Sequence, residues 1–255
     1  MNISSRLQRN NITNHNNQYS IKVLSFMKLK NSFYIVITFS IIILFTLAFT
    51  SLETSQISLN QKAKVSKDTV WIFNGKNLSN LKLILDKDNI KSGNIYSIKD
   101  NSIFFNKGYK GYIRTKEKYS GFNLHAEWKW TKKNEKGNSG ILVFIQSTDT
   151  IWPNCIQINF KEQHAGDLIA MNGAEFYEAV GKSKNTEVIH SSSSENPEGE
   201  WNSCDIFCHA DSMIVYINSV LQNRATKIVN HDGYVGWQLE GKPIALRNLF
   251  LVIEK

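Results

Sequence analysis

Short apolar runs separated by turn residues fill the chain from residue 69 to its end. No helical run of convincing length lies between them, so the pattern predicts many short strands and an all-β sandwich or barrel. The first apolar burst, Val70 to Phe73, ends at an Asn-Gly turn signal. Further strands are predicted at 95–105, 112–119, 122–131, 140–147, 155–161, 203–210, 213–223, 233–239 and 244–254. We therefore expect one antiparallel sandwich domain over residues 69–255.

The run at 122–130 alternates between apolar and polar residues. One face carries Phe122, Leu124, Ala126, Trp128 and Trp130, and the other carries Asn123, His125, Glu127 and Lys129. Because successive side chains of a strand point to opposite faces, the aromatic side belongs to the core. The polar side is either a plain solvent face or part of a surface that hydrogen-bonds a hydroxyl-rich ligand.

The stretch from 137 to 178 combines two strand-length runs with the densest group of polar residues in the chain. In the second run, Ile156, Ile158 and Phe160 alternate with Gln157, Asn159 and Lys161. After it come His164, Gly166, Asp167, Asn172, Gly173, Glu175 and Glu178. Two interpretations fit: a solvated face followed by a turn-rich loop, or a functional loop held between rigid strands.

The beginning of the chain has a different character. Residues 1–32 are polar and basic, with Lys28 and Lys30 just ahead of an apolar segment at 33–50, and residues 51–68 have the polar composition of a linker. Basic residues followed by an apolar run are typical of a signal peptide or an uncleaved membrane anchor, and this run has a length compatible with either. Both interpretations predict export to the periplasm, cell surface or medium, with membrane contact only through this segment.

The net charge of +8 comes mostly from the same region. Residues 1–66 contain seven Lys or Arg and one acid, Glu53, which leaves 23 basic and 21 acidic residues for the remainder. A nucleic-acid-binding protein would need a clustered basic patch in its folded part. We therefore expect no nucleic-acid partner.

The three cysteines are Cys155, Cys204 and Cys208. Cys204 and Cys208 lie four residues apart in a predicted strand, which separates their Cα atoms by roughly 13 Å, too far for a disulfide. We interpret both as buried small apolar residues. No closely spaced set of Cys and His residues has the pattern of a zinc site.

Six motifs occur in an order that resembles the 3-keto-disaccharide hydrolase domain family. They are WIFNGK with Leu78, GNSGI at 137–141, Trp152-Pro153 with Cys155, AGD at 165–167, GEWN at 199–202, and Gly233-Tyr234 through Gly236 and Gln238 to Arg247-Asn248. The resemblance covers the chain from about residue 69 to the end. It implies a jelly-roll sandwich of the concanavalin A-like lectin/glucanase type, exported by bacteria that degrade glycans, and hydrolysis of glycosides oxidised at C3.

The sequence departs from that family pattern at two places. Many members carry an acid in the strand after the WP-x-C segment, where this chain has Gln157 and Asn159. An arginine that often follows the GNSG strand is also missing, with Val143 and Phe144 in that region. The amides keep the capacity to hydrogen-bond sugar hydroxyls but remove a carboxylate.

The activity implied by the resemblance requires particular kinds of side chain. A ketone at C3 acidifies the C2 proton, so a base can remove it while the group at C1 leaves, and water can add afterwards. Such a site needs a base and a group that polarises the ketone. The bases present are His164, Asp167, Glu127, Glu175 and Glu178. A divalent cation held by Asp167 or the nearby glutamates would polarise the ketone, although no ligand spacing here is diagnostic.

We expect the candidate site to gather in one cleft. The predicted catalytic residues are His164, Asp167 and Glu127, and the predicted substrate-binding residues are Asn138, Gln157, Asn159 and Glu175. Three functions fit: an enzyme that cleaves 3-keto-glycosides, a non-catalytic carbohydrate-binding domain on the same sandwich, and an adhesion or scaffold domain displayed at the membrane. The partner expected in the first two is an oxidised disaccharide or another glycoside.

Overall fold

The structure is a computed structural model that describes residues 68–86, 92–132, 137–146, 149–181, 187–240 and 242–254. Tertiary contacts divide the chain after Val65, and all of these residues belong to the second unit. The predicted basic region, the apolar segment 33–50 and the linker up to residue 67 lie outside the described residues. Within the described ranges, no helix is both long and apolar enough to span a membrane.

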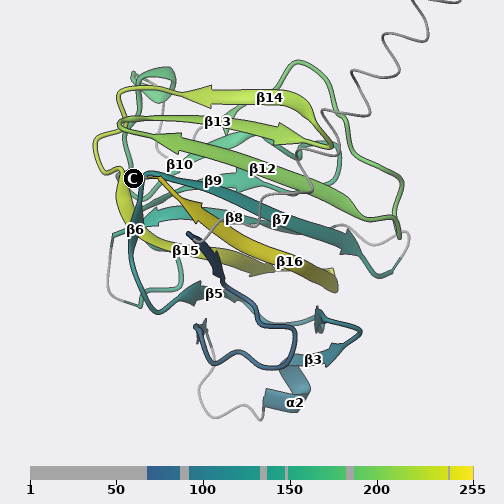
Figure 1. The fold of residues 1–255 in the computed structure, drawn as a ribbon. Helices are drawn as coiled ribbons and strands as arrows, with labels where there is room; N and C mark the ends of the chain where they lie inside the picture. Colours follow the sequence, from purple (N-terminus) through teal and green to yellow (C-terminus); the bar gives the residue numbers. More distant parts are fainter. Residues whose placement is uncertain are drawn as a thin grey trace, which may run out of the picture. The chain divides into compact units, whose positions relative to one another are not determined.

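Two antiparallel sheets form the domain, and Figure 1 shows one in front of the other. The front sheet runs in the order β14 (Val220–Ala225), β13 (Ser212–Ile217), β12 (Asn202–His209), β7 (Phe122–Trp130), β16 (Ile244–Ile253), β4 (Ser102–Phe105) and β3 (Tyr96–Lys99), with β1 (Thr69–Trp71) also paired to β16. Consecutive strands often change sheet: β7 belongs to the front sheet, and the next strand along the chain to the back one.

The back sheet runs in the order β11 (Glu187–Val188), β10 (Leu168–Met171), β9 (Cys155–Asn159), β8 (Asn138–Ile145), β15 (Asp232–Glu240), β5 (Gly111–Thr115) and β2 (Leu81–Leu85), with β6 (Tyr119–Ser120) also paired to β15. In the described ranges, the helical elements are the single turns α2 (Ser92–Ile95) and η1 (Tyr177–Ala179). The sequence-based prediction of an all-β antiparallel sandwich is confirmed.

Two runs that were predicted as single strands are hairpins. The run 95–105 turns at Asp100 and Asn101, whose φ angles are 49° and 54°. The run 213–223 turns in the same way at Asn218 and Ser219, with φ angles of 50° and 66°. Two successive residues with positive φ make the tight turn whose twist matches antiparallel strands, and Asn and Asp tolerate that conformation better than other side chains.

Three strands of the back sheet were not predicted from the sequence: β2, β10 and the two-residue β11. Residues 81–85 pair with β5, and residues 168–171 pair with β9. The second segment, Leu-Ile-Ala-Met, shows no alternation of apolar and polar residues, so the pattern does not predict it as a strand. Long-range pairing with β9 makes it a strand, and this pairing brings the adjacent Asp167 to the sheet.

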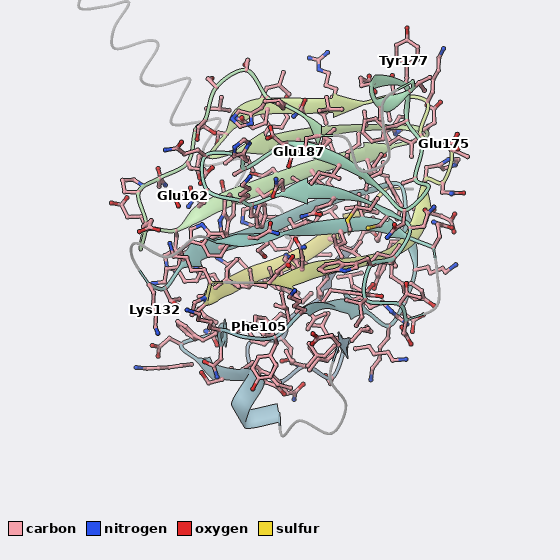
Figure 2. All side chains as sticks on the ribbon, turned by 180° about the vertical axis from the view of Figure 1, so that it is seen from behind. Phe105, Lys132, Glu162, Glu175, Tyr177 and Glu187 are labelled. Atoms are coloured by element: carbon pink, nitrogen blue, oxygen red, sulfur yellow. The ribbon has the colours of Figure 1, made fainter. Side chains whose placement is uncertain are left out.

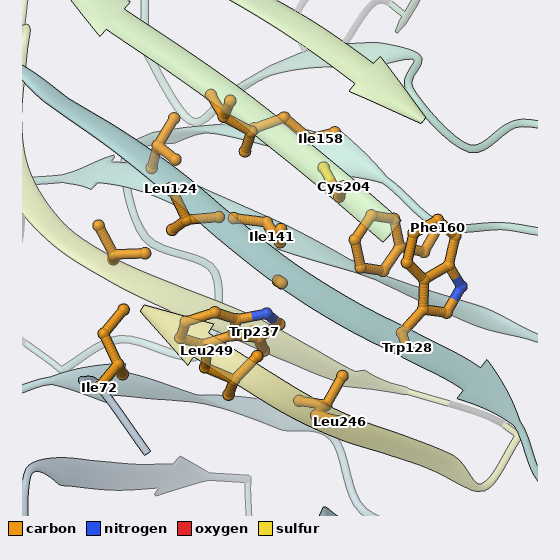
Figure 3. Close-up of a cluster of buried hydrophobic side chains, with 14 of the residues drawn as sticks. Ile72, Leu124, Trp128, Ile141, Ile158, Phe160, Cys204, Trp237, Leu246 and Leu249 are labelled. Carbon is orange, nitrogen blue, oxygen red and sulfur yellow. The ribbon is translucent and has the colours of Figure 1, made fainter. Parts of the chain in front are cut away.

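A single apolar cluster fills the space between the sheets (Figure 3). The rings of Trp128 from the front sheet and Phe160 from the back sheet stack with centroids 3.9 Å apart and planes 7° apart. Such contacts join the layers through large buried areas. Cys204 and Cys208 are free and buried, as predicted, and burial raises the pKa of both thiols.

Candidate functional site

The two polar strand faces that the sequence singled out lie on opposite sides of the sandwich. On β7 the core-facing residues alternate with His125 and Glu127, which therefore face away from the back sheet. On β9 the core-facing isoleucines alternate with Gln157 and Asn159, which face away from the front sheet. The structure therefore contains two separate polar surfaces, one on each sheet.

A cleft of about 320 Å³ lies on the outward face of the back sheet. Its lining residues are Gly137, Asn138, Gln157, Asn159, Lys161, Ile169 and Glu187. Gly140 lies beside it, and a Cβ atom there would come within 2.5 Å of the Ile158 carbonyl oxygen and 2.9 Å of Gln157 Nε2. The glycine of the GNSG motif is therefore required because the backbone of β9 and the Gln157 amide approach β8 so closely.

One side of the cleft is a ladder of amides and a carboxylate across three strands. Gln157 Nε2 donates to Gln238 Oε1 at 2.6 Å, and Gln238 Nε2 donates to Glu240 Oε2 at 3.1 Å. Asn138 Nδ2 also donates to Glu240 Oε2 at 3.1 Å. Gln157 is only 3% exposed, so its amide is held in place by partners rather than by water. The ladder gives the cleft a rigid set of hydrogen-bonding groups.

Close to Glu187, which lines the cleft, Asp167 is fully buried and contacts two histidines. Its Oδ2 atom lies 2.8 Å from His164 Nδ1. Its Oδ1 atom accepts the His190 backbone N–H at 2.7 Å and also contacts His190 Nδ1. In a neutral ring, a proton on Nδ1 leaves the lone pair on Nε2. The carboxylate therefore holds both imidazoles with Nε2 as the basic atom, and His164 is the more accessible of the two, 35% exposed against 5%.

Glu187 connects this cluster to the cleft. Its Oε1 atom accepts a hydrogen bond from Asn159 Nδ2 at 3.3 Å, and Glu187 itself lines the cleft. One ligand atom from each of His164, Asp167 and Glu187 lies within 4.8 Å of the other two. Two carboxylates and an imidazole are donors that suit a divalent cation. Among the described residues, this is the one group of three or more His, Cys, Asp and Glu side chains close enough to share an ion.

Local backbone chemistry brings His164 and Asp167 together. The turn is closed by hydrogen bonds from the His164 N–H to the Lys161 carbonyl and from the Asp167 N–H to the His164 carbonyl, at 2.8 and 3.1 Å. Gly166 has a φ of 98°, and a Cβ atom there would lie 2.6 Å from Gln222. Glycine at the centre of the AGD motif is therefore required by both backbone angle and packing.

Five of the residues predicted from sequence belong to this site. Asn138, Gln157 and Asn159 line the cleft, Asp167 and His164 form the cluster at its side, and Asn159 joins the two through Glu187. Glu175 is exposed beyond the opposite end of β9, beside Asn154 and Cys155, and Figure 2 shows it well apart from the labelled Glu187. Glu178 does not line the cleft, and its carboxylate accepts hydrogen bonds from the backbone and hydroxyl of Thr226, both at 2.9 Å.

Glu127 requires a correction, because it lies on the outward face of the front sheet and not in the cleft. Its carboxylate accepts hydrogen bonds of 2.6 Å from Arg247 Nε and from Asn248 Nδ2. Partial burial opposes ionisation, but hydrogen bonds from His125, Asn248 and Arg247 outweigh it and lower the pKa of Glu127 to about 2. A carboxylate so strongly stabilised in its charged form is a poor base.

Four residues of the site were missed from sequence. Gln238 and Glu240 lie on the polar face of β15; the predicted strand 233–239 contains Gln238 but ends one residue before Glu240. Glu187 and His190 lie in a segment too short to be recognised as a strand. The alternating polar residues Gln238 and Glu240 could have been recognised from the sequence as one polar strand face. β11 could not, because it forms only by pairing with β10.

The sequence of the whole domain matches a known family. A family model for the 3-keto-α-glucoside-1,2-lyase-like domain covers residues 68–252. The chain belongs to this family. The resemblance to 3-keto-disaccharide hydrolases that the motifs indicated is therefore confirmed. A search of curated proteins gives no match to the sequence.

Solved structures with the same fold include two candidate glycosyl hydrolases from Parabacteroides distasonis. One is 17% identical, with a TM-score of 0.53, and the match covers 74% of this chain and 95% of that one. The other is 20% identical, with the same TM-score and coverages of 73% and 99%. The β-glucanase of Bacillus licheniformis is 14% identical, with a TM-score of 0.52 and coverages of 75% and 100%. At these identities the likeness shows the fold alone, and it confirms the predicted jelly-roll sandwich of the lectin/glucanase type.

Proposed function

We propose that this member of the 3-keto-α-glucoside-1,2-lyase-like family cleaves the glycosidic bond of a C3-oxidised sugar. A base removes the proton from C2, the electron pair forms the C1–C2 double bond, the C1–O bond breaks and the aglycone leaves with a proton. Water then adds across the double bond, with hydroxyl to C1 and a proton to C2, to give the free 3-keto sugar. The observation that carries the proposal is the buried Asp167, which holds two imidazoles beside the cleft.

His164 is the proposed base. Asp167 fixes its Nδ1 atom at 2.8 Å, so the neutral ring presents Nε2 for proton transfer. This pairing also stabilises the imidazolium that forms when the C2 proton arrives, as a carboxylate does behind a catalytic histidine. His190 contacts the other carboxylate oxygen and is nearly buried, so its proposed role is to position Asp167.

A divalent cation fits the same cluster. The carboxylates of Asp167 and Glu187 would hold it beside His164, since ligand atoms of the three residues lie within 4.8 Å of one another, and the lone pair of His164 Nε2 would remain for the C2 proton. A bound cation would supply a Lewis acid for the negative charge that develops on the C3 oxygen. The amide groups of Asn138, Gln157 and Asn159 would hold sugar hydroxyls, because amides both donate and accept hydrogen bonds.

The direct test is to incubate the purified protein with a 3-keto-glucoside, with and without added Mn²⁺, and to follow release of the aglycone. We expect turnover that increases with the cation and is lost in His164→Ala. A parent protein that releases no aglycone under either condition would contradict the proposal. Turnover that persists undiminished in His164→Ala would contradict the assignment of the base.

A second function, non-catalytic carbohydrate binding, is favoured by one observation. The position at which many family members carry an acid is Gln157, and its amide is fixed by Gln238 rather than aimed as a base. This alternative predicts that the protein binds a 3-keto-glucoside without releasing the aglycone. It also predicts that Gln157→Ala abolishes binding, which calorimetric titration would measure.

Export is the remaining part of the proposal. Lys28 and Lys30 ahead of the apolar segment 33–50 support it. A fusion of residues 1–66 to a reporter that is active only outside the cytoplasm should give signal. Activity of a cytoplasmic reporter alone would contradict export.

A further inference from the structure

A second pocket lies at the front sheet, whereas the cleft that contains Gln157 lies on the back sheet. Its volume is about 490 Å³, and its lining residues are Trp71, Phe73, Asn74, Gly75, Asn101 and Asn248. Trp71 pairs with Phe250 across β1 and β16, and Phe250 pairs with His125, whose side chain faces outward. Cross-strand partners share a face, so the Trp71 ring lies on the outward side. The pocket is therefore separate from the cleft that contains Gln157.

The lining combines one exposed aromatic plane with amides. Trp71 is 44% exposed, and its ring contacts that of Phe250 with centroids 5.1 Å apart, which fixes its orientation. Among the described residues that line the pocket, none is charged, and three are asparagines. An aromatic plane with a few convergent polar groups in a cavity of this size is the usual composition of a small-molecule site. The absence of charged lining residues favours a neutral ligand.

The asparagines are held in fixed positions. Asn74 Oδ1 accepts the backbone N–H groups of Lys76 and Asn77 at 2.8 and 2.9 Å, which makes the FNG segment a rigid turn. Asn248 Nδ2 donates to Glu127 at 2.6 Å, so its carbonyl oxygen remains as the acceptor on that side chain. Asn101 occupies the tight turn between β3 and β4 with a φ of 54°. Such preorganisation lowers the entropic cost of binding.

We propose that this pocket is a second saccharide-binding site, which takes a glucosyl unit of a neutral glucan by stacking it on Trp71. In a β-glucosyl ring all substituents are equatorial, so the two ring faces present C–H groups to an aromatic plane while the hydroxyls point to the edge. The indole would contact a ring face, and the amides of Asn101 and Asn248 would contact the hydroxyls. The site shares only its ligand class with the proposed function, and it would hold the glycan at a point remote from cleavage.

The test is the retardation of the full-length chain in native gels that contain mixed-linkage β-glucan. We expect the parent protein to be retarded, and Trp71→Ala to weaken binding about threefold to tenfold, as loss of an aromatic contact predicts. Asn101→Gly serves as a second variant, because glycine keeps the positive φ of the turn while it removes the amide. It should also reduce retardation.

Two control variants distinguish glucan binding at this pocket from binding in the cleft and from nonspecific binding through exposed indoles. Trp152→Ala removes an indole that is 36% exposed elsewhere on the domain and should leave retardation unchanged. Asp167→Asn alters the cluster beside the cleft and should also leave retardation by the glucan unchanged. Glucan binding at the Trp71 pocket can therefore be shown even if the protein cleaves no 3-keto-glucoside. A parent protein that migrates freely through the glucan, or a Trp71→Ala variant with normal fold and parental retardation, would overturn the proposal.

Discussion

The two outward faces of the sandwich each pair a histidine with an aspartate, but the pairs differ in what surrounds them. On the front sheet, His125 Nδ1 lies 2.6 Å from Asp205, and the adjacent Glu127 is neutralised by Arg247. On the back sheet, Asp167 contacts two histidines, and Glu187 lies nearby without a described Lys or Arg in an ion pair with it. In the first network the carboxylate of Glu127 is paired with a guanidinium, whereas in the second the ion pairs of Asp167 among the described residues are with histidine side chains alone.

The difference shows why a histidine beside a carboxylate does not by itself mark a catalytic site. Burial opposes protonation of His125, but hydrogen bonds to Asp205 and Glu127 outweigh it and raise its pKa to about 9. The imidazole is therefore protonated near neutral pH and has no lone pair for a substrate. The back-sheet cluster instead adjoins a cleft of about 320 Å³. A carboxylate paired with a guanidinium away from a cleft favours a structural role, whereas a carboxylate–histidine cluster beside a cleft favours a functional one.

The largest expected effect is on turnover in Asp167→Asn. The amide keeps the shape of the side chain but has only one acceptor oxygen, so it cannot accept the Nδ1 protons of both imidazoles as the carboxylate does. We therefore expect about a 100-fold or greater loss of aglycone release. Asp205→Asn is the matched control, because it changes the other His-paired aspartate. It should change turnover by less than about twofold. Similar losses in both variants would contradict the distinction between the two faces.

A second prediction concerns cation binding, measured by thermal unfolding. If Mn²⁺ binds the folded cluster, a concentration of 100 times its Kd should stabilise the protein by about 2.7 kcal/mol. Glu187→Gln removes one ligand and should lose most of this gain. Glu240→Gln, on the same face but outside the group of three, should retain it. An equal Mn²⁺ response in both variants would show that Glu187 is not a ligand.

A third prediction concerns the pH dependence of stability on the front sheet. The folded-state pKa of His125 is raised from 6.5 to about 9, so its stabilisation is full below pH 6.5 and is lost as pH rises through 9. The shift corresponds to at most about 3 kcal/mol, and less because Glu127 shares the interaction. In urea unfolding, the difference between the parent and His125→Gln should shrink from pH 6 to pH 9.5. A constant difference would contradict the protonated network.

How much the sequence could predict differs between the fold and the site. Alternation identified β7 and β9 and correctly placed their apolar sides in the core, because burial of one face imposes a period of two. The same pattern could not say which strands are neighbours. β7 pairs with β12 and β16, whereas β9 pairs with β8 and β10, so the polar sides of β7 and β9 face opposite directions.

The site shows the same limit at the level of single residues. His164 and Asp167 are three positions apart and were predicted in the same cleft, and in the structure a local turn brings them into contact. Glu187 and His190 reach Asp167 from 20 or more positions away, and only the pairing of β10 with β11 brings them there. Local chemistry can be predicted from spacing, but contacts made by sheet pairing require the topology.

The smallest expected effect is that of Arg247→Ala, which tests whether the front-sheet network is only structural. The guanidinium binds Glu127 at 2.6 Å and lies over the Trp201 ring at 4.0 Å, yet its side chain is 36% exposed, so solvent screens the ion pair. We expect a loss of about 1 kcal/mol in the free energy of unfolding and turnover within about twofold of the parent. Arg247→Lys should recover only part of the stability, because an ammonium group cannot both stack flat on Trp201 and bind the carboxylate through two nitrogens. A large loss of turnover in a variant as stable as the parent would indicate that the front face takes part in the reaction. It would contradict the assignment of the chemistry to the Asp167 cluster alone.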